Sequence, residues 1–129
     1  MLPSSQHVNK AIAASAGWYT DPVKDIKFPY GLAQSPFANL DLSLFFKKDF
    51  KIMVGGNDTD PNSSSLRHNS IVDLQGLNRK DRAIHYYTLS KMISSTKNQP
   101  FNWSLEIVPS AEHDFKQSLA NAAHWILVN

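Results

Sequence analysis

The stretch "FKIMVGG" at residues 50–56 limits the folds open to this chain more than any other segment does. It is a near-continuous apolar run that ends in two glycines. Such a run is typical of a strand that is buried on both faces, as in a parallel sheet with helices on either side. The stretch therefore predicts a layered α/β structure with this strand in its interior.

The segments on either side of this strand alternate between strand and helix patterns. The expected order is strand, helix, strand, helices, strand and helix, within residues 8–16, 39–49, 50–56, 66–97, 102–108 and 115–126. The long helical pattern has a break near Gly76, and Asp114 is well placed to cap the final helix. Strands that alternate with helices form βαβ units, so we predict an α/β fold with about three mainly parallel strands and flanking helices.

The composition argues against several classes of protein. The chain has 129 residues, a net charge of +2 and no cysteine. A charge this small does not favour binding to nucleic acid or to an anionic membrane, and the run "RKDR" at 79–82 is expected to be a solvated helix start. The absence of cysteine excludes disulfides, thiolate metal sites and a cysteine nucleophile. No signal peptide and no membrane-spanning run is visible, and the cellular location is left open.

Polar side chains follow two of the predicted strands. Asp58 comes three residues after Gly55, and His113 comes five residues after Val108. The carboxyl ends of parallel strands lie at one edge of a sheet, where functional groups gather. A histidine that moves protons needs a carboxylate to orient its ring and stabilise the imidazolium. The two loops therefore predict an acid–base pair at this edge.

Six segments together resemble the C-terminal part of an α/β-hydrolase, in a subgroup of hydrolases and esterases. They cover nearly the whole chain and are "AGWYT" at 16–20, "FPYGL" at 28–32, "VGGNDTDP" at 54–61, "QGLNRKDRA" at 75–83, "FNWSLEIVP" at 101–109 and "HD" at 113–114. The resemblance implies that Asp58 is the acid and His113 the base of a Ser-Asp-His triad. Asp60, in the same loop as Asp58, is the alternative acid.

The chain departs from the family pattern in three places. Ser110 replaces a usual glycine, and Gly56-Asn57 replaces a usual Gly-Glu pair, which we expect to alter only loop detail. The larger departure is that no two glycines bracket a serine as G-x-S-x-G, so the nucleophile elbow is absent. The resemblance therefore implies that residues 1–129 form a single partial domain without the nucleophile-bearing N-terminal part. Such sheet domains commonly need on the order of 200 residues or more.

A sheet of about three strands would leave one edge without a partner strand. Exposed edges are templates for pairing with another chain. We therefore expect self-association or a complementing chain at that edge.

The loop "NDTDPNS" has one competing interpretation, as a calcium-binding loop. Asp58, Asp60 and Asn62 match its first three ligand positions, but Ser63 and Asn69 stand where the glycine and the glutamate are required. We therefore expect a turn rich in Asp and Asn instead.

Four further histidines and two aromatic residues are the other candidates for a role in binding. We expect no metal and no cofactor, since the remaining histidines lack metal-ligand spacing; they are His7, His68, His85 and His124. Trp18 and Tyr19 follow a predicted strand and are the candidate substrate-binding residues, although aromatic residues at such positions are as often simple packing. An arginine of the helix near residues 79–82 is expected to hold a loop carbonyl or carboxylate in place.

The sequence leads to two hypotheses for function. In the first, the intact parent is a serine hydrolase that acts on a small-molecule ester or related acyl bond, and this chain alone is inactive because it lacks the nucleophile. In the second, the chain is a truncated, non-catalytic hydrolase remnant that serves as a structural or interaction module. The identity of the substrate lies beyond these residues.

Overall fold

A computed structural model describes residues 10–36, 38–39 and 41–113 of the chain. The strands are β1 (Lys10–Ala14), β2 (Asp49–Gly55) and β3 (Ser104–Val108). The helices are α2 (Ser43–Lys47), the 3₁₀ helix η1 (Val72–Gln75) and α3 (Arg79–Thr96). The predicted final helix and its cap Asp114 lie outside the described residues.

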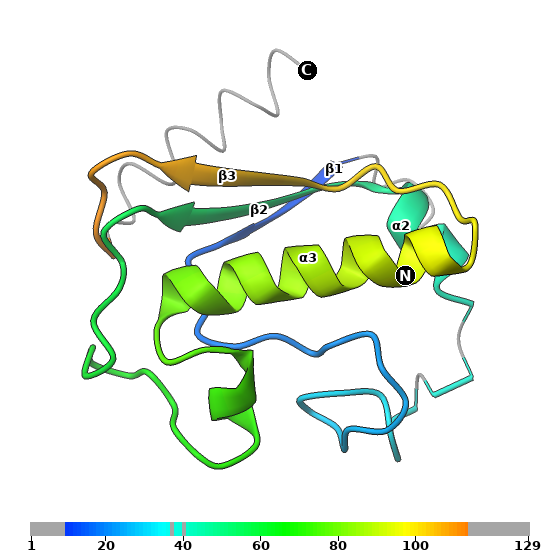
Figure 1. Cartoon of the computed structure of the whole chain (residues 1–129), viewed down its shortest axis with the longest axis horizontal. Coiled ribbons are helices and arrows are strands. Elements are labelled where there is room, and N and C mark those ends of the chain that lie inside the picture. The colour runs from blue at the N-terminus through cyan, green and yellow to red at the C-terminus, as the bar shows by residue number, and fades with distance from the viewer. Residues whose placement is uncertain (1–9, 37, 40, 114–129) are drawn as a thin grey trace, which may run out of the picture.

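The three strands form one parallel sheet in the order β1-β2-β3. Each connection crosses over through irregular chain and helix, and α3 lies along one face of the sheet (Figure 1). Ile52, Met53 and Val54 are each 0% exposed, although successive side chains of a strand point to opposite faces. β2 is therefore buried on both faces, as the apolar run predicted.

The core lies between the sheet and α3 and is rich in aromatic residues. Trp103, just before β3, makes ring contacts with Phe46, Phe50, Tyr86 and Phe101. Its indole nitrogen donates a hydrogen bond to the Phe45 carbonyl at 2.9 Å. These contacts join α2, α3 and the start of β3, and so fix how the helical layer lies against the sheet.

The helical pattern expected over residues 66–97 is wrong at its start. Residues 66–71 are not helical, and only η1 precedes the long helix. The Asn69 side chain accepts hydrogen bonds from the backbone N–H groups of Ile71 and Val72, which gives the backbone an alternative to a helical turn. Gly76, with φ of 133°, separates η1 from α3, and the Asn78 side chain caps α3 by accepting from the Asp81 N–H at 2.8 Å.

Candidate active site

Asp58 and His113 come together at the carboxyl ends of β2 and β3. His113 Nδ1 lies 3.3 Å from Asp58 Oδ2. The Asp58 side chain is 3% exposed and the His113 side chain 30% exposed. A buried carboxylate against a partly exposed imidazole is the arrangement in which an acid can orient a base that reaches a substrate.

Backbone contacts fix the two loops against each other. The Gly56 N–H donates to the Val108 carbonyl and the Asn57 N–H to the Ala111 carbonyl, both at 2.8 Å. A Cβ atom at Gly55 would lie only 2.3 Å from the Ala111 carbonyl oxygen. The end of β2 must therefore be glycine for the His113 loop to approach this closely.

Arg79, at the start of α3, holds the loop that carries Asp58. Its Nη1 donates to Ser63 Oγ at 2.6 Å, and its Nη2 donates to the Ser64 carbonyl at 3.2 Å. The same Nη1 lies 3.9 Å from Asp58 Oδ1, and both side chains are almost fully buried. The expectation that the run at 79–82 is a solvated helix start is therefore wrong for its two arginines, since Arg79 is 4% and Arg82 0% exposed. The Lys80 N–H also donates to the Asp58 carbonyl. The expectation that an arginine of this helix holds a loop carbonyl or carboxylate is confirmed.

Arg82 ties the loop after β1 to the helical layer. Its guanidinium is 0% exposed and donates from Nη1 to the Gly17 carbonyl and from Nε to the Gly76 carbonyl, both at 2.8 Å. Its Nη2 donates to Asp73 Oδ1 at 3.0 Å. These bonds satisfy a buried charge and fix the loop that begins at the end of β1.

Asp60, the alternative acid, lies elsewhere in the same loop. It is exposed, and its Oδ1 accepts the Asn62 N–H at 2.8 Å, as in the turn expected for this segment. The geometry therefore places Asp58, and not Asp60, beside His113.

The sequence did not indicate the partners of two other histidines. His85 Nε2 lies 2.9 Å from Asp21 Oδ2, with side-chain exposures of 34% and 3%. The hydrogen bond that Asp21 accepts from His85 raises the pKa of His85. His68 Nδ1 lies 2.7 Å from Asp73 Oδ1, a pair only five residues apart. His7 and His124 lie outside the described residues.

The two pairs with a buried aspartate differ in their place in the fold. His85 lies within α3 and meets a loop residue, whereas Asp58 and His113 both follow parallel strands. A histidine near an aspartate is thus not sufficient to mark an active site. The position at the strand ends is what singles out the Asp58–His113 pair.

The two candidate substrate-binding aromatics have different surroundings. Tyr19 is 6% exposed, belongs to the core and stacks on Tyr86 with ring centroids 4.6 Å apart. This placement favours packing over contact with a substrate. Trp18 is partly exposed and lies edge-on to Tyr30, with ring centroids 5.3 Å apart. A substrate contact by Trp18 stays a prediction.

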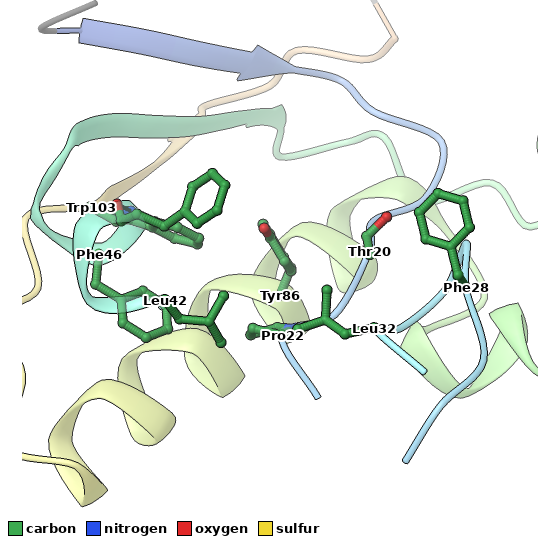
Figure 2. Close-up of a pocket in the computed structure, with 9 residues that line it drawn as sticks. Thr20, Pro22, Phe28, Leu32, Leu42, Phe46, Tyr86 and Trp103 are labelled. Atoms are coloured by element: carbon green, nitrogen blue, oxygen red, sulfur yellow. Dashed lines mark hydrogen bonds between the residues drawn. The ribbon is translucent and has the colours of Figure 1, made fainter. Parts of the chain in front are cut away.

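An apolar pocket of about 240 Å³ lies between α2, α3 and the loop after β1 (Figure 2). Its lining residues are Thr20, Pro22, Phe28, Leu32, Leu42, Phe45, Phe46, Tyr86 and Trp103. Neither Asp58 nor His113 lines it. The pocket is therefore separate from the candidate acid–base pair.

Other kinds of site find little support in the part of the chain that the structure describes. No group of three or more His, Asp or Glu side chains is placed to hold a metal ion there. No described helix has the length and apolar character needed to cross a bilayer. The chemistry that the described residues offer at the strand ends is therefore that of an imidazole oriented by a carboxylate.

Comparison with known proteins places the chain beside two hydrolytic enzymes. No protein-family model and no curated protein matches it. The structure of poly(aspartic acid) hydrolase-1 from Sphingomonas sp. KT-1 matches with a TM-score of 0.82 and 31% sequence identity, over 93% of this chain and 45% of that protein. A poly(3-hydroxybutyrate) depolymerase from Bordetella parapertussis matches with a TM-score of 0.82 and 29% identity, over 93% of this chain and 42% of that protein.

The chain spans less than half the length of either similar protein. The predicted resemblance to the C-terminal part of α/β-hydrolases is confirmed. The predicted fold, three parallel strands with flanking helices, is confirmed as well.

Proposed function

We propose that the intact protein is a serine hydrolase that acts on an ester or related acyl bond, and that this chain supplies its acid and base. The observation that carries the proposal is the 3.3 Å contact between Asp58 Oδ2 and His113 Nδ1 at the ends of two parallel strands. Two similar structures, one of a hydrolase and one of a depolymerase, support the hydrolytic class.

In this proposal His113 acts as the general base and then as the general acid. Its Nδ1 faces Asp58, so Nε2 is the nitrogen that takes the proton from a serine hydroxyl and later gives it to the leaving group. Asp58 fixes the tautomer and stabilises the imidazolium that forms. Burial of Asp58 keeps water from competing for this contact.

The nucleophile is not part of the chain, because the sequence contains no G-x-S-x-G elbow. We therefore expect the chain alone to be inactive, since loss of the nucleophile from such a triad lowers kcat by several orders of magnitude. A longer parent with an in-frame G-x-S-x-G segment upstream of Met1 is the form in which activity is expected.

A fluorophosphonate probe, which labels activated serines, tests the proposal on that longer parent. Labelling is expected for the parent and should be lost in the His113→Ala variant. His85→Ala is the matched control, because His85 also contacts a buried aspartate and has a similar exposed fraction. Absence of labelling in the parent, or equal loss in both variants, would contradict the proposed role of His113.

The second hypothesis, a non-catalytic interaction module, is favoured by one observation, the edges of the sheet. Within the described residues, β1 and β3 each pair with β2 alone. An open edge recruits a further strand, from a second copy or from a complementing chain. Size-exclusion chromatography with light scattering should then find dimers or larger species, whereas a dispersed monomer that melts cooperatively would contradict this hypothesis.

A further inference from the structure

Arg67 is an exposed cation in the loop between β2 and η1. Its guanidinium carbon lies 5.5 Å from the centre of the Trp18 ring, within the range of a cation–π contact. Its Nη1 donates a hydrogen bond to Tyr30 Oη at 3.1 Å. Among the residues that the structure describes, no carboxylate forms an ion pair with it. Arg67 thus presents a positive charge that is held in place and that no carboxylate of the described residues neutralises.

The groups that hold Arg67 are themselves fixed. Tyr30 is 8% exposed, and its hydroxyl also accepts a hydrogen bond from Asn69 Nδ2 at 3.0 Å. The Tyr30 ring packs edge-on against Trp18. Trp18 is thereby held in position beneath the Arg67 guanidinium, which lies over its ring. A guanidinium that is already ordered loses little side-chain entropy when it binds a ligand.

Arg67 and Trp18 approach each other from two loops that begin at the carboxyl ends of parallel strands. Trp18 follows β1, and Arg67 lies in the loop that leaves β2 and carries Asp58. These are the loops from which an α/β sheet builds its ligand sites.

We propose that Arg67 and Trp18 form a subsite that binds a carboxylate group carried by the substrate of the proposed hydrolase. A guanidinium has five N–H donors in a planar fork that matches the two oxygens of a carboxylate. One hydrogen bond, to Tyr30, engages the fork within the described residues. The exposed part of the Trp18 ring that Arg67 leaves uncovered then contacts the carbon chain that carries the carboxylate. This subsite names a substrate class for the proposed function and rests on it.

Binding of two matched esters to the whole chain tests the subsite without any need for catalysis. Monomethyl succinate carries one carboxylate, and dimethyl succinate is neutral and of similar size. Titration followed by the indole N–H resonance of Trp18 should show binding of the monoester about tenfold tighter than that of the diester. This preference should weaken as salt is added, because the subsite is exposed. Equal affinity for the two esters in the wild-type chain would overturn the proposal.

Two variants distinguish the effect of the Arg67 guanidinium on binding from the effect of losing any one positive charge. Arg67→Gln keeps a donor for Tyr30 but removes the charge, and it should weaken monoester binding about tenfold. Lys91→Ala is the matched control, because Lys91 is an exposed cation that lies 5.9 Å from the Tyr87 ring on α3. Unchanged binding in Arg67→Gln, or an equal loss in Lys91→Ala, would overturn the proposal.

One further measurement completes the test. The titration needs no nucleophile, so a failure of the proposed catalysis in the longer parent leaves the subsite standing. Inorganic phosphate is the competing anion for an arginine fork, and tighter binding of phosphate than of the monoester would overturn the assignment to a carboxylate.

Discussion

The Gly55→Ala substitution is expected to separate His113 from Asp58. The added Cβ would lie 2.3 Å from the Ala111 carbonyl oxygen and 2.6 Å from the Glu112 carbonyl oxygen. Both atoms belong to the backbone, so no side-chain rotation relieves the clash. An ordinary van der Waals contact between a carbon and an oxygen atom is about 1 Å longer than the 2.3 Å distance to Ala111. The loop before His113 must therefore shift by about that amount.

A shift of this size is large against the contact that it disturbs. The 3.3 Å separation of Asp58 Oδ2 and His113 Nδ1 is already at the long end of a hydrogen bond. A further 1 Å breaks it. Overpacking of this kind lowers the free energy of unfolding by about 1–3 kcal/mol. With a typical urea dependence, the midpoint of urea unfolding should fall by about 1 M.

Two other glycines supply graded controls for this prediction. A Cβ at Gly56 would lie 3.3 Å from the Val108 carbonyl oxygen, and a Cβ at Gly17 would have nothing within 4 Å. Urea unfolding of the three alanine variants should therefore show a large loss of stability at Gly55, a small loss at Gly56 and almost none at Gly17. Equal urea midpoints for Gly55→Ala and Gly17→Ala would refute the claim that the loop before His113 can approach β2 only because residue 55 is glycine.

Three further expectations concern stability. Ser110 has φ of 59°, a conformation that favours glycine, so Ser110→Gly should raise the free energy of unfolding by about 0.5 kcal/mol, and a lower urea midpoint would contradict this. The hydrogen bond that Asp73 accepts from His68, and then the one that the Pro61 carbonyl accepts from it, raise the pKa of the exposed His68. Because the folded pKa is the higher one, this stabilisation is complete below about pH 6.5 and is lost as pH rises through the folded pKa. His68→Asn should therefore flatten the fall in urea midpoint between pH 6 and pH 8, and an unchanged slope would exclude this role for His68. Arg82→Lys should lower the free energy of unfolding by about 3 kcal/mol, because an ammonium does not reproduce the three hydrogen bonds of the buried guanidinium. A loss below about 1 kcal/mol would contradict this and show that the groups around residue 82 rearrange to bind the ammonium.

The features that follow from periodicity and chain order were predictable from the sequence. The run at residues 50–56 predicted a strand buried on both faces, and Ile52, Met53 and Val54 are all fully buried. The positions of Asp58 and His113 after two strands predicted that they meet, because parallel strands end at one edge of the sheet. Both expectations depend on backbone topology, which apolar patterns encode.

The features that the sequence did not predict depend on how irregular loops fold. Asp21 and His85 are 64 residues apart, and Trp18 and Arg67 are 49 apart, with no repeat or motif to connect them. The helical pattern of residues 66–71 was misleading because the Asn69 side chain takes the N–H groups of the following residues. Side-chain hydrogen bonds of this kind decide loop structure and leave no period in the sequence.

The geometry of the acid–base pair depends on contacts made within the described chain. The Gly56 and Asn57 N–H groups join the chain after β2 to the last residue of β3 and to the loop that follows it, while Arg79 and Lys80 join the Asp58 loop to α3. None of these contacts uses the sides of β1 and β3 that face away from β2, which have no partner strand within the described residues. The pair can therefore keep its geometry in a three-stranded sheet, even if the edges bind another strand. Under the proposed function, a complementing segment would have to supply the nucleophile, and Asp58 and His113 would already be in place to activate it.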